Sequence, residues 1–249
     1  MVPRLRSFGR DEVDLSIDFG THNRAVLVTR LLAQCSIDAT ADTLDLYRRL
    51  SAGKRLQCLL QLAMTDPSRP LSIPCRCLAC HQELELELTL HELSDVQQAA
   101  DAIATITVGS GPQRLALRKP TGHDMEAWGE MAFADEGAAL GTMIAGLLID
   151  PPSAPIAPAS IAAIEEALEA ADPLIDFRCT AACGECGEAN ECQIDLMEIA
   201  LHLLRRSQHE LVASLHRLAT HYHWTEQEIF AVPAWRRQRY LQLIGATGK

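Results

Sequence analysis

Two C-x-x-C motifs lie about a hundred residues apart in this chain, and they constrain its fold more than any other feature. Two residues between a pair of thiolates is the spacing with which a tight turn directs both sulfurs at one metal ion. Four thiolates complete a closed tetrahedral shell, which zinc favours and which leaves no position for water or substrate. The sequence therefore predicts one structural zinc per chain, bound by Cys77, Cys80, Cys183 and Cys186.

Each of these motifs, called a knuckle below, is followed by a strand-like segment, as in zinc ribbons. The first knuckle leads into the alternating Glu/Leu run 83–90, and the second leads into 191–196. We expect a small antiparallel zinc-ribbon-like sheet, split between residues 71–90 and 174–195. Other residues near the knuckles leave the ligand set open, because any of them could replace a ligand: Cys75, Cys179, Cys192 and His81.

The first knuckle also spells C-x-x-C-H with His81, the attachment signature of a c-type haem. That attachment requires an exported chain, and the basic N-terminus lacks the apolar core of a signal peptide. His81 runs directly into the Glu/Leu alternation, whereas a haem ligand usually lies in a helix. Neither knuckle opens a helix after a strand in the manner of a redox C-x-x-C. These observations favour zinc over haem or redox chemistry.

Composition limits the classes of function. The chain has 249 residues, 48% of them hydrophobic, and a formal charge of −11. Such an acidic chain is not expected to bind a nucleic-acid backbone over its general surface. No stretch approaches the roughly 18 apolar residues of a membrane span, and nine cysteines without an export signal favour a reducing compartment. We therefore expect a cytoplasmic protein without a membrane or nucleic-acid partner.

No arrangement of residues typical of an enzyme is evident in the sequence. A nucleophile elbow, a phosphate-binding glycine loop and an H-E-x-x-H motif are all missing. We therefore expect no catalytic residue, no small-molecule substrate and a protein that is not an enzyme.

Hydrophobic periodicity predicts a helix-rich α+β protein in three parts. These are an irregular N-terminal arm (1–20), an α+β body with the two knuckles (21–195) and a C-terminal helical segment (196–249). Within the body we expect two or three helices in 22–64, with Gly53 separating the last two, and a hairpin in 103–118. A helical stretch should follow at 121–148, broken near 134–135, and then a linker at 151–155. Further helices are expected at 159–171 and 196–222. A capping-box spacing opens a short helix at Thr225, and Pro233 marks the start of the last helix.

From about residue 40, most of the chain resembles a family of small proteins encoded in the tail-gene clusters of contractile phages and related phage-tail-like injection systems. Four segments carry the resemblance. Residues 215–229 read L-H-R-L-A-T-H-Y-H-W-T-E-Q-E-I, and 233–241 read P-A-W-R-R-Q-R-Y-L. Residues 117–124 read L-R-K-P-T-G-H-D, and 193–195 read Q-I-D after the second knuckle. The family carries a C-P-x-C-G knuckle in each half. The distance from the second knuckle to the Q-I-D tail implies that Cys183 and Cys186 match the family's cysteines, rather than Cys179 and Cys192. Here His81 replaces the usual glycine, and neither knuckle has the proline.

The resemblance implies a baseplate or baseplate-hub assembly protein. Its partners would be other baseplate or tail proteins, and it would act in the cytoplasm of the producing or host bacterium or in the particle itself. We expect a docking surface among the aromatic and cationic residues of the C-terminal segment: Tyr222, Trp224, Trp235, Arg236, Arg237, Arg239 and Tyr240. The alternative is that the aromatic residues close the helices on the core and that the arginines are only solvated. The alternative function is a zinc-ribbon transcriptional regulator that binds nucleic acid.

Overall fold

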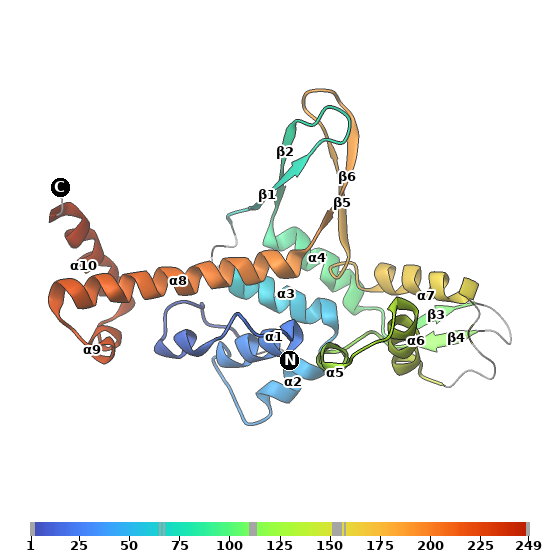
Figure 1. Ribbon diagram of the computed structural model, residues 1–249, viewed down its shortest axis with the longest axis horizontal. Helices are drawn as coiled ribbons and strands as arrows, with labels where there is room; N and C mark the ends of the chain where they lie inside the picture. The colour runs from blue at the N-terminus through green and yellow to red at the C-terminus, as the bar shows by residue number, and fades with distance from the viewer. Residues whose placement is uncertain are drawn as a thin grey trace.

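The computed structural model describes residues 3–64, 66, 68–109, 114–150, 156 and 158–247. A long helix, α8 (Leu196–Tyr222), extends from a helical body to the C-terminal helices, and two hairpins project from the body (Figure 1). The described elements are mostly helices, with three two-stranded antiparallel sheets. The predicted helix-rich α+β class is confirmed, and the helix predicted at 196–222 has the same bounds as α8.

Three helices form the N-terminal part of the body: α1 (Arg24–Gln34), α2 (Thr43–Arg49) and α3 (Ala52–Ala63). The prediction that Gly53 separates two helices is wrong, because Ser51 is the N-cap of α3 and its hydroxyl accepts from the Lys54 amide. Gly53 lies in the first turn, where a Cβ would collide with the Asp172 carboxylate and the Gln97 amide. Glycine therefore allows a close approach here rather than a break.

The main core unites the two halves of the chain. Helices α1, α3 and α8 contribute side chains that are almost fully buried, namely Leu31, Leu32, Leu59, Leu60, Leu196 and Leu204. Burying each such leucine contributes roughly 1.5–3 kcal/mol relative to an exposed position. Packing of α8 on α3 therefore holds residues on either side of the central segment in one folding unit.

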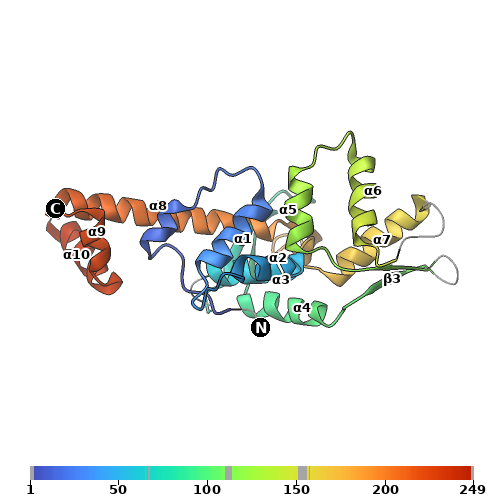
Figure 2. The same ribbon diagram turned by 90° about the horizontal axis from the view of Figure 1, so that it is seen from below.

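A second, smaller core lies beside the first (Figure 2). The predicted hairpin forms from β3 (Ile106–Val108) and β4 (Leu115–Leu117) and packs with α6 (Glu136–Leu147) and α7 (Pro158–Ala171). Helix α5 (Gly122–Glu130) ends before α6 begins, so the predicted break near 134–135 is confirmed. The turn at 110–113 and the predicted linker at 151–155 lie outside the described residues.

The N-terminal segment is irregular, as expected, but it packs against the body and is not a free arm. A short 3-10 helix, η1 (Glu12–Ser16), buries Asp14 completely. The Arg6 guanidinium donates two hydrogen bonds to Asp14 at 2.6 and 3.0 Å, and Gln208 of α8 donates to the Asp14 and Ile17 carbonyls. These contacts hold the segment against α8.

One helix was not predicted from the sequence. Strand β2 ends at Leu88, and α4 (Leu90–Asp101) follows, so the strand expected at 83–90 is two residues too long. Thr89 is the N-cap, and its hydroxyl accepts from the Glu92 amide while the Glu92 carboxylate accepts from Thr89. This capping box ends the strand and starts the helix.

In the L-R-K-P-T-G-H-D segment, the arginine and the threonine both bind the aspartate at the start of α5. The Arg118 guanidinium donates to both Asp124 oxygens at 2.6 and 2.7 Å, and the Thr121 amide and hydroxyl donate to the same carboxylate. Burial alone would raise the pKa of Asp124, but these donors outweigh it and lower the pKa to about 2. Since the folded-state pKa is depressed, this stabilisation is present above about pH 4 and is lost as the pH falls toward about 2.

We predict that Asp124→Asn lowers the free energy of unfolding at pH 7 by about 1–3 kcal/mol, because it leaves Arg118 without its ionised partner. The difference from the wild type should shrink at pH 3, where the wild-type carboxylate is closer to protonation. Urea unfolding at the two pH values measures both effects. The matched control is Glu166→Gln, because the Glu166 side chain is exposed on α7 and makes no hydrogen bond or ion pair with a described side chain. Equal stabilities of the wild type and Asp124→Asn at pH 7 would contradict this role.

Candidate metal centre

Two antiparallel hairpins carry the knuckles at their tips. The first consists of β1 (Leu71–Arg76) and β2 (Glu83–Leu88), and the second of β5 (Phe177–Ala182) and β6 (Ala189–Ile194). The hairpins project side by side from the body (Figure 1). Strand β6 leads almost directly into α8, whose N-cap Asp195 accepts from the Glu198 amide. The metal centre is thus connected through a short segment to the longest helix.

Both knuckles have the same backbone geometry. In the first, the Cys77 amide donates to the Gln82 carbonyl and the His81 amide donates to the Cys77 carbonyl. In the second, the Cys183 and Gly187 amides make the matching bonds. His81 and Gly187 occupy the same turn position, with φ of 62° and 75°. Only glycine adopts this left-handed region without strain, which explains why a glycine is suited to the position that His81 fills here.

The four predicted cysteines converge. Their sulfurs all lie within 4.8 Å of one another, with Cys77 and Cys186 at 3.7 Å and Cys80 and Cys183 at 3.6 Å. A tetrahedral ion with metal–sulfur bonds of about 2.3 Å requires sulfurs about 3.8 Å apart. The arrangement can therefore hold a metal ion, with two ligands from each half of the chain.

The thiols are electrostatically coupled. Donation from the Cys80 and Ala79 amides stabilises the Cys77 thiolate and lowers its pKa to about 6. The Glu188 amide likewise favours the Cys186 thiolate, but the neighbouring sulfurs, Cys80 foremost, outweigh it and raise the pKa of Cys186 to about 12. The Cys77 thiolate thus forms readily, while the pKa values of the Cys80 and Cys186 thiols are raised. A bound cation removes this repulsion, so metal uptake releases protons and weakens at low pH.

The other candidate ligands lie outside this cluster. Cys179 and Cys192 are cross-strand partners in β5 and β6, below the knuckle, and Cys75 is in β1. Burial raises the pKa of Cys75 to about 11, so this thiol stays protonated at neutral pH. The His81 side chain is exposed. Neither His81 nor any of these three cysteines belongs to the four-sulfur group. The structure therefore favours Cys183 and Cys186 as the ligands from the second knuckle.

Sequence reasoning missed Asn190. This side chain is only 2% exposed, and its carboxamide oxygen accepts from the Leu78 amide of the other hairpin at 2.8 Å. Its amide group donates to the Glu188 carbonyl at 2.9 Å. Asn190 also stabilises the Cys77 thiolate by a side-chain hydrogen bond. Asn190 therefore supports the first knuckle from the second hairpin. No sequence pattern reveals that an asparagine beside a C-x-x-C motif will be buried and will bind the opposite knuckle.

The C-terminal candidates fall into two groups. Tyr222, Trp224 and Tyr240 pack on one another, with the first two rings stacked at 4.7 Å and Tyr240 at 5.5 Å from each. Their cluster closes α9 (Glu226–Ala231) and α10 (Ala234–Thr247) onto the end of α8. These three rings therefore form a small core, as in the alternative considered from the sequence.

Arg237 must also be removed from the set of exposed cations. It is only 9% exposed, lies over the Phe230 ring at 4.9 Å and donates to the Arg10 carbonyl at 2.8 Å. On a helix, neighbouring residues point in different directions, and Arg237 faces the N-terminal segment. The exposed members of the predicted set are Trp235, which is 71% exposed, with Arg236 and Arg239.

Comparisons of the chain with protein-family models, with curated proteins and with solved structures find no match. Among the described residues, no helix is both long and apolar enough to cross a membrane.

We predict that Cys183→Ser abolishes stoichiometric metal binding and lowers the melting temperature, because three thiolates cannot close the shell. Elemental analysis of the purified protein, together with thermal unfolding, measures both. Cys179→Ser is the control, since it removes a neighbouring thiol of the same hairpin. Full metal content in Cys183→Ser, with loss in Cys179→Ser, would show that the ligand assignment is wrong.

Proposed function

We propose that the metal is zinc and that its role is structural. Four thiolates are soft ligands with the tetrahedral spacing that zinc favours. A shell closed by four protein ligands leaves no open position for water or substrate. The ion would act as a cross-link between the two hairpins, one per chain.

We further propose that the protein is a non-enzymatic assembly component, an adaptor or chaperone, of a contractile tail baseplate. The resemblance of residues 117–124, 193–195 and 215–241 to that family supports this proposal. Each segment has a definite place: the Arg118–Asp124 pair begins α5, residues 193–195 connect β6 to α8, and 215–241 form the C-terminal helical end. Its partners would be other tail or baseplate proteins, met in the bacterial cytoplasm or in the particle.

The exposed indole of Trp235 beside Arg236 and Arg239 is the observation that carries the docking role. Tryptophan and arginine dominate the energetics of protein interfaces, whereas an indole this exposed contributes little to folding. Helix α8 has 27 residues, which is about 40 Å at 1.5 Å per residue. It carries this surface to the far end of the molecule from α6 and α7 (Figure 1).

The alternative is a transcriptional regulator that binds nucleic acid through the knuckles. The charge of −11 and the exposed glutamates on β2 oppose it, because phosphate contacts need a basic surface. Binding to duplex DNA that weakens steeply with salt would favour this alternative over an assembly role.

We predict that Arg236→Glu with Arg239→Glu abolishes co-purification with a co-expressed tail or baseplate protein. Both side chains are exposed, so metal content and melting temperature should stay unchanged. The matched control is Arg30→Glu with Arg114→Glu, which changes the net charge equally at exposed positions elsewhere. Particle assembly that is unaffected by the first pair would count against the docking role.

We also predict opposite behaviour for two tryptophans. Trp224→Ala should lower the free energy of unfolding by about 2 kcal/mol or more, because Trp224 belongs to the C-terminal core. Trp235→Ala should leave stability within about 0.5 kcal/mol of the wild type and weaken partner binding at least about tenfold. Chemical unfolding and a binding titration with the co-purified partner measure the two effects. Strong destabilisation by Trp235→Ala would contradict an interface role for that side chain.

A further inference from the structure

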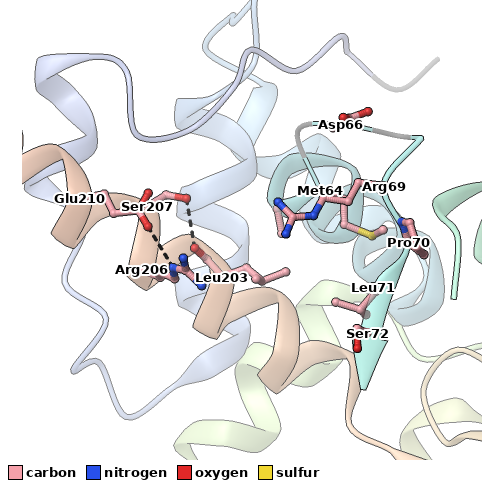
Figure 3. Close-up of a pocket in the computed structure, with 11 residues that line it drawn as sticks. Met64, Asp66, Arg69, Pro70, Leu71, Ser72, Leu203, Arg206, Ser207 and Glu210 are labelled. Atoms are coloured by element: carbon pink, nitrogen blue, oxygen red, sulfur yellow. Dashed lines mark hydrogen bonds and ion pairs between the residues drawn. The ribbon is translucent and has the colours of Figure 1, made fainter. Parts of the chain in front are cut away.

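Two hollows adjoin along one face of α8. The first, of about 440 Å³, lies between α8 and residues 63–64, 66 and 69–72 (Figure 3). The second, of about 510 Å³, lies between α8, residues 8–10 and α10. Ser207 and Glu210 border both. We call the two hollows together the α8 groove.

The floor of the α8 groove is a single helical stripe. The α8 residues that line it recur three or four positions apart, so they share one face of the helix. From Leu203 to Leu218 this face extends about 22 Å, which is long enough for about six residues of an extended peptide. Of its apolar side chains, Leu203 is half-buried, whereas Leu211, Leu215 and Leu218 already pack in the C-terminal core.

The walls of the groove are cationic although the chain is acidic. Arg10, Arg69 and Arg237 line it, and none of them forms an ion pair with a described residue. Arg69 extends over the first hollow toward α8 (Figure 3). Arg237 is nine-tenths buried, and one of its terminal nitrogens, Nη1, has no hydrogen-bond partner among the described residues. Burial lowers the pKa of Arg237, although the negative charge of nearby Asp11 acts to raise it.

The carboxylates of the groove are already engaged. Glu210 accepts from Arg206 at 2.9 Å along α8, as Figure 3 shows. Asp66 accepts from the Ser68 amide and hydroxyl at 3.0 and 2.6 Å; Arg69 attracts this carboxylate but makes no ion pair with it. The three arginines therefore face the groove without a carboxylate of their own chain in ion-pair contact. An arginine fork is matched geometrically to a carboxylate, and an isolated buried guanidinium is costly.

We propose that the α8 groove binds an acidic segment of a partner protein that also carries aliphatic side chains. Aliphatic groups would pack on Leu203. Carboxylates would pair with Arg10 and Arg69 and approach Arg237, and Trp235 would close over the segment at the rim. This inference rests on the proposed docking function and names the chemistry of the partner.

The test uses the full-length, metal-loaded protein and a library of random dodecapeptides. We expect enrichment of peptides that combine Asp or Glu with Leu or Ile. An enriched peptide should bind at least about tenfold more weakly when its carboxylates are changed to carboxamides, and binding should weaken with salt. Fluorescence anisotropy with the labelled peptide gives the affinities.

Arg10→Glu with Arg69→Glu should also weaken that peptide at least about tenfold, since both side chains are exposed and their reversal leaves the fold intact. Arg30→Glu with Arg114→Glu is the matched control and should bind as the wild type does. The proposal would be overturned if no such peptides were enriched, or if both double variants lost affinity equally. It would also be overturned if the protein formed a dimer that the Arg10/Arg69 reversal dissociates. The library contains no tail protein, so this outcome is independent of the Arg236/Arg239 test of the proposed function.

Discussion

The convergence of four thiolates is the interaction on which the arrangement of the two hairpins depends. A two-stranded hairpin is at best marginally stable alone, and the leucines on β2 are only partly buried. Four sulfurs within 4.8 Å of one another repel when ionised, as the raised pKa of Cys186 records. A bound metal ion would convert that repulsion into a cross-link. Because β1 follows α3 and β6 precedes α8, such a cross-link would also reinforce the packing of α3 on α8.

The remaining architecture follows from α8. Its first half is buried in the main core by Leu196, Leu201 and Leu204, and its last turns are closed by the aromatic cluster around Trp224. Between these anchors, the N-terminal segment, residues 69–72 and α10 flank one face of the helix and border the α8 groove. The same helix therefore links the metal centre, the groove and the exposed Trp235.

The sequence predicted those parts whose signals are local. The C-x-x-C spacing identified the four sulfurs, and apolar periodicity located α8. Helix α4 was missed because the Glu/Leu alternation continues to Leu90 and obscures the capping box of Thr89 and Glu92. Features that depend on distant partners could not be predicted: Asn190 across the hairpins, Asp14 beneath Arg6, and the burial of Arg237 against the N-terminal segment.

The central claim is that one ion is held by sulfur alone, with two ligands from each half of the chain. X-ray absorption spectroscopy at the zinc edge of the purified protein tests it most directly. The account predicts four sulfur scatterers at about 2.3 Å and no lighter ligand. A nitrogen scatterer at about 2.0–2.1 Å would show that a histidine replaces one of the cysteines. That result, or a purified protein without zinc, would contradict the account.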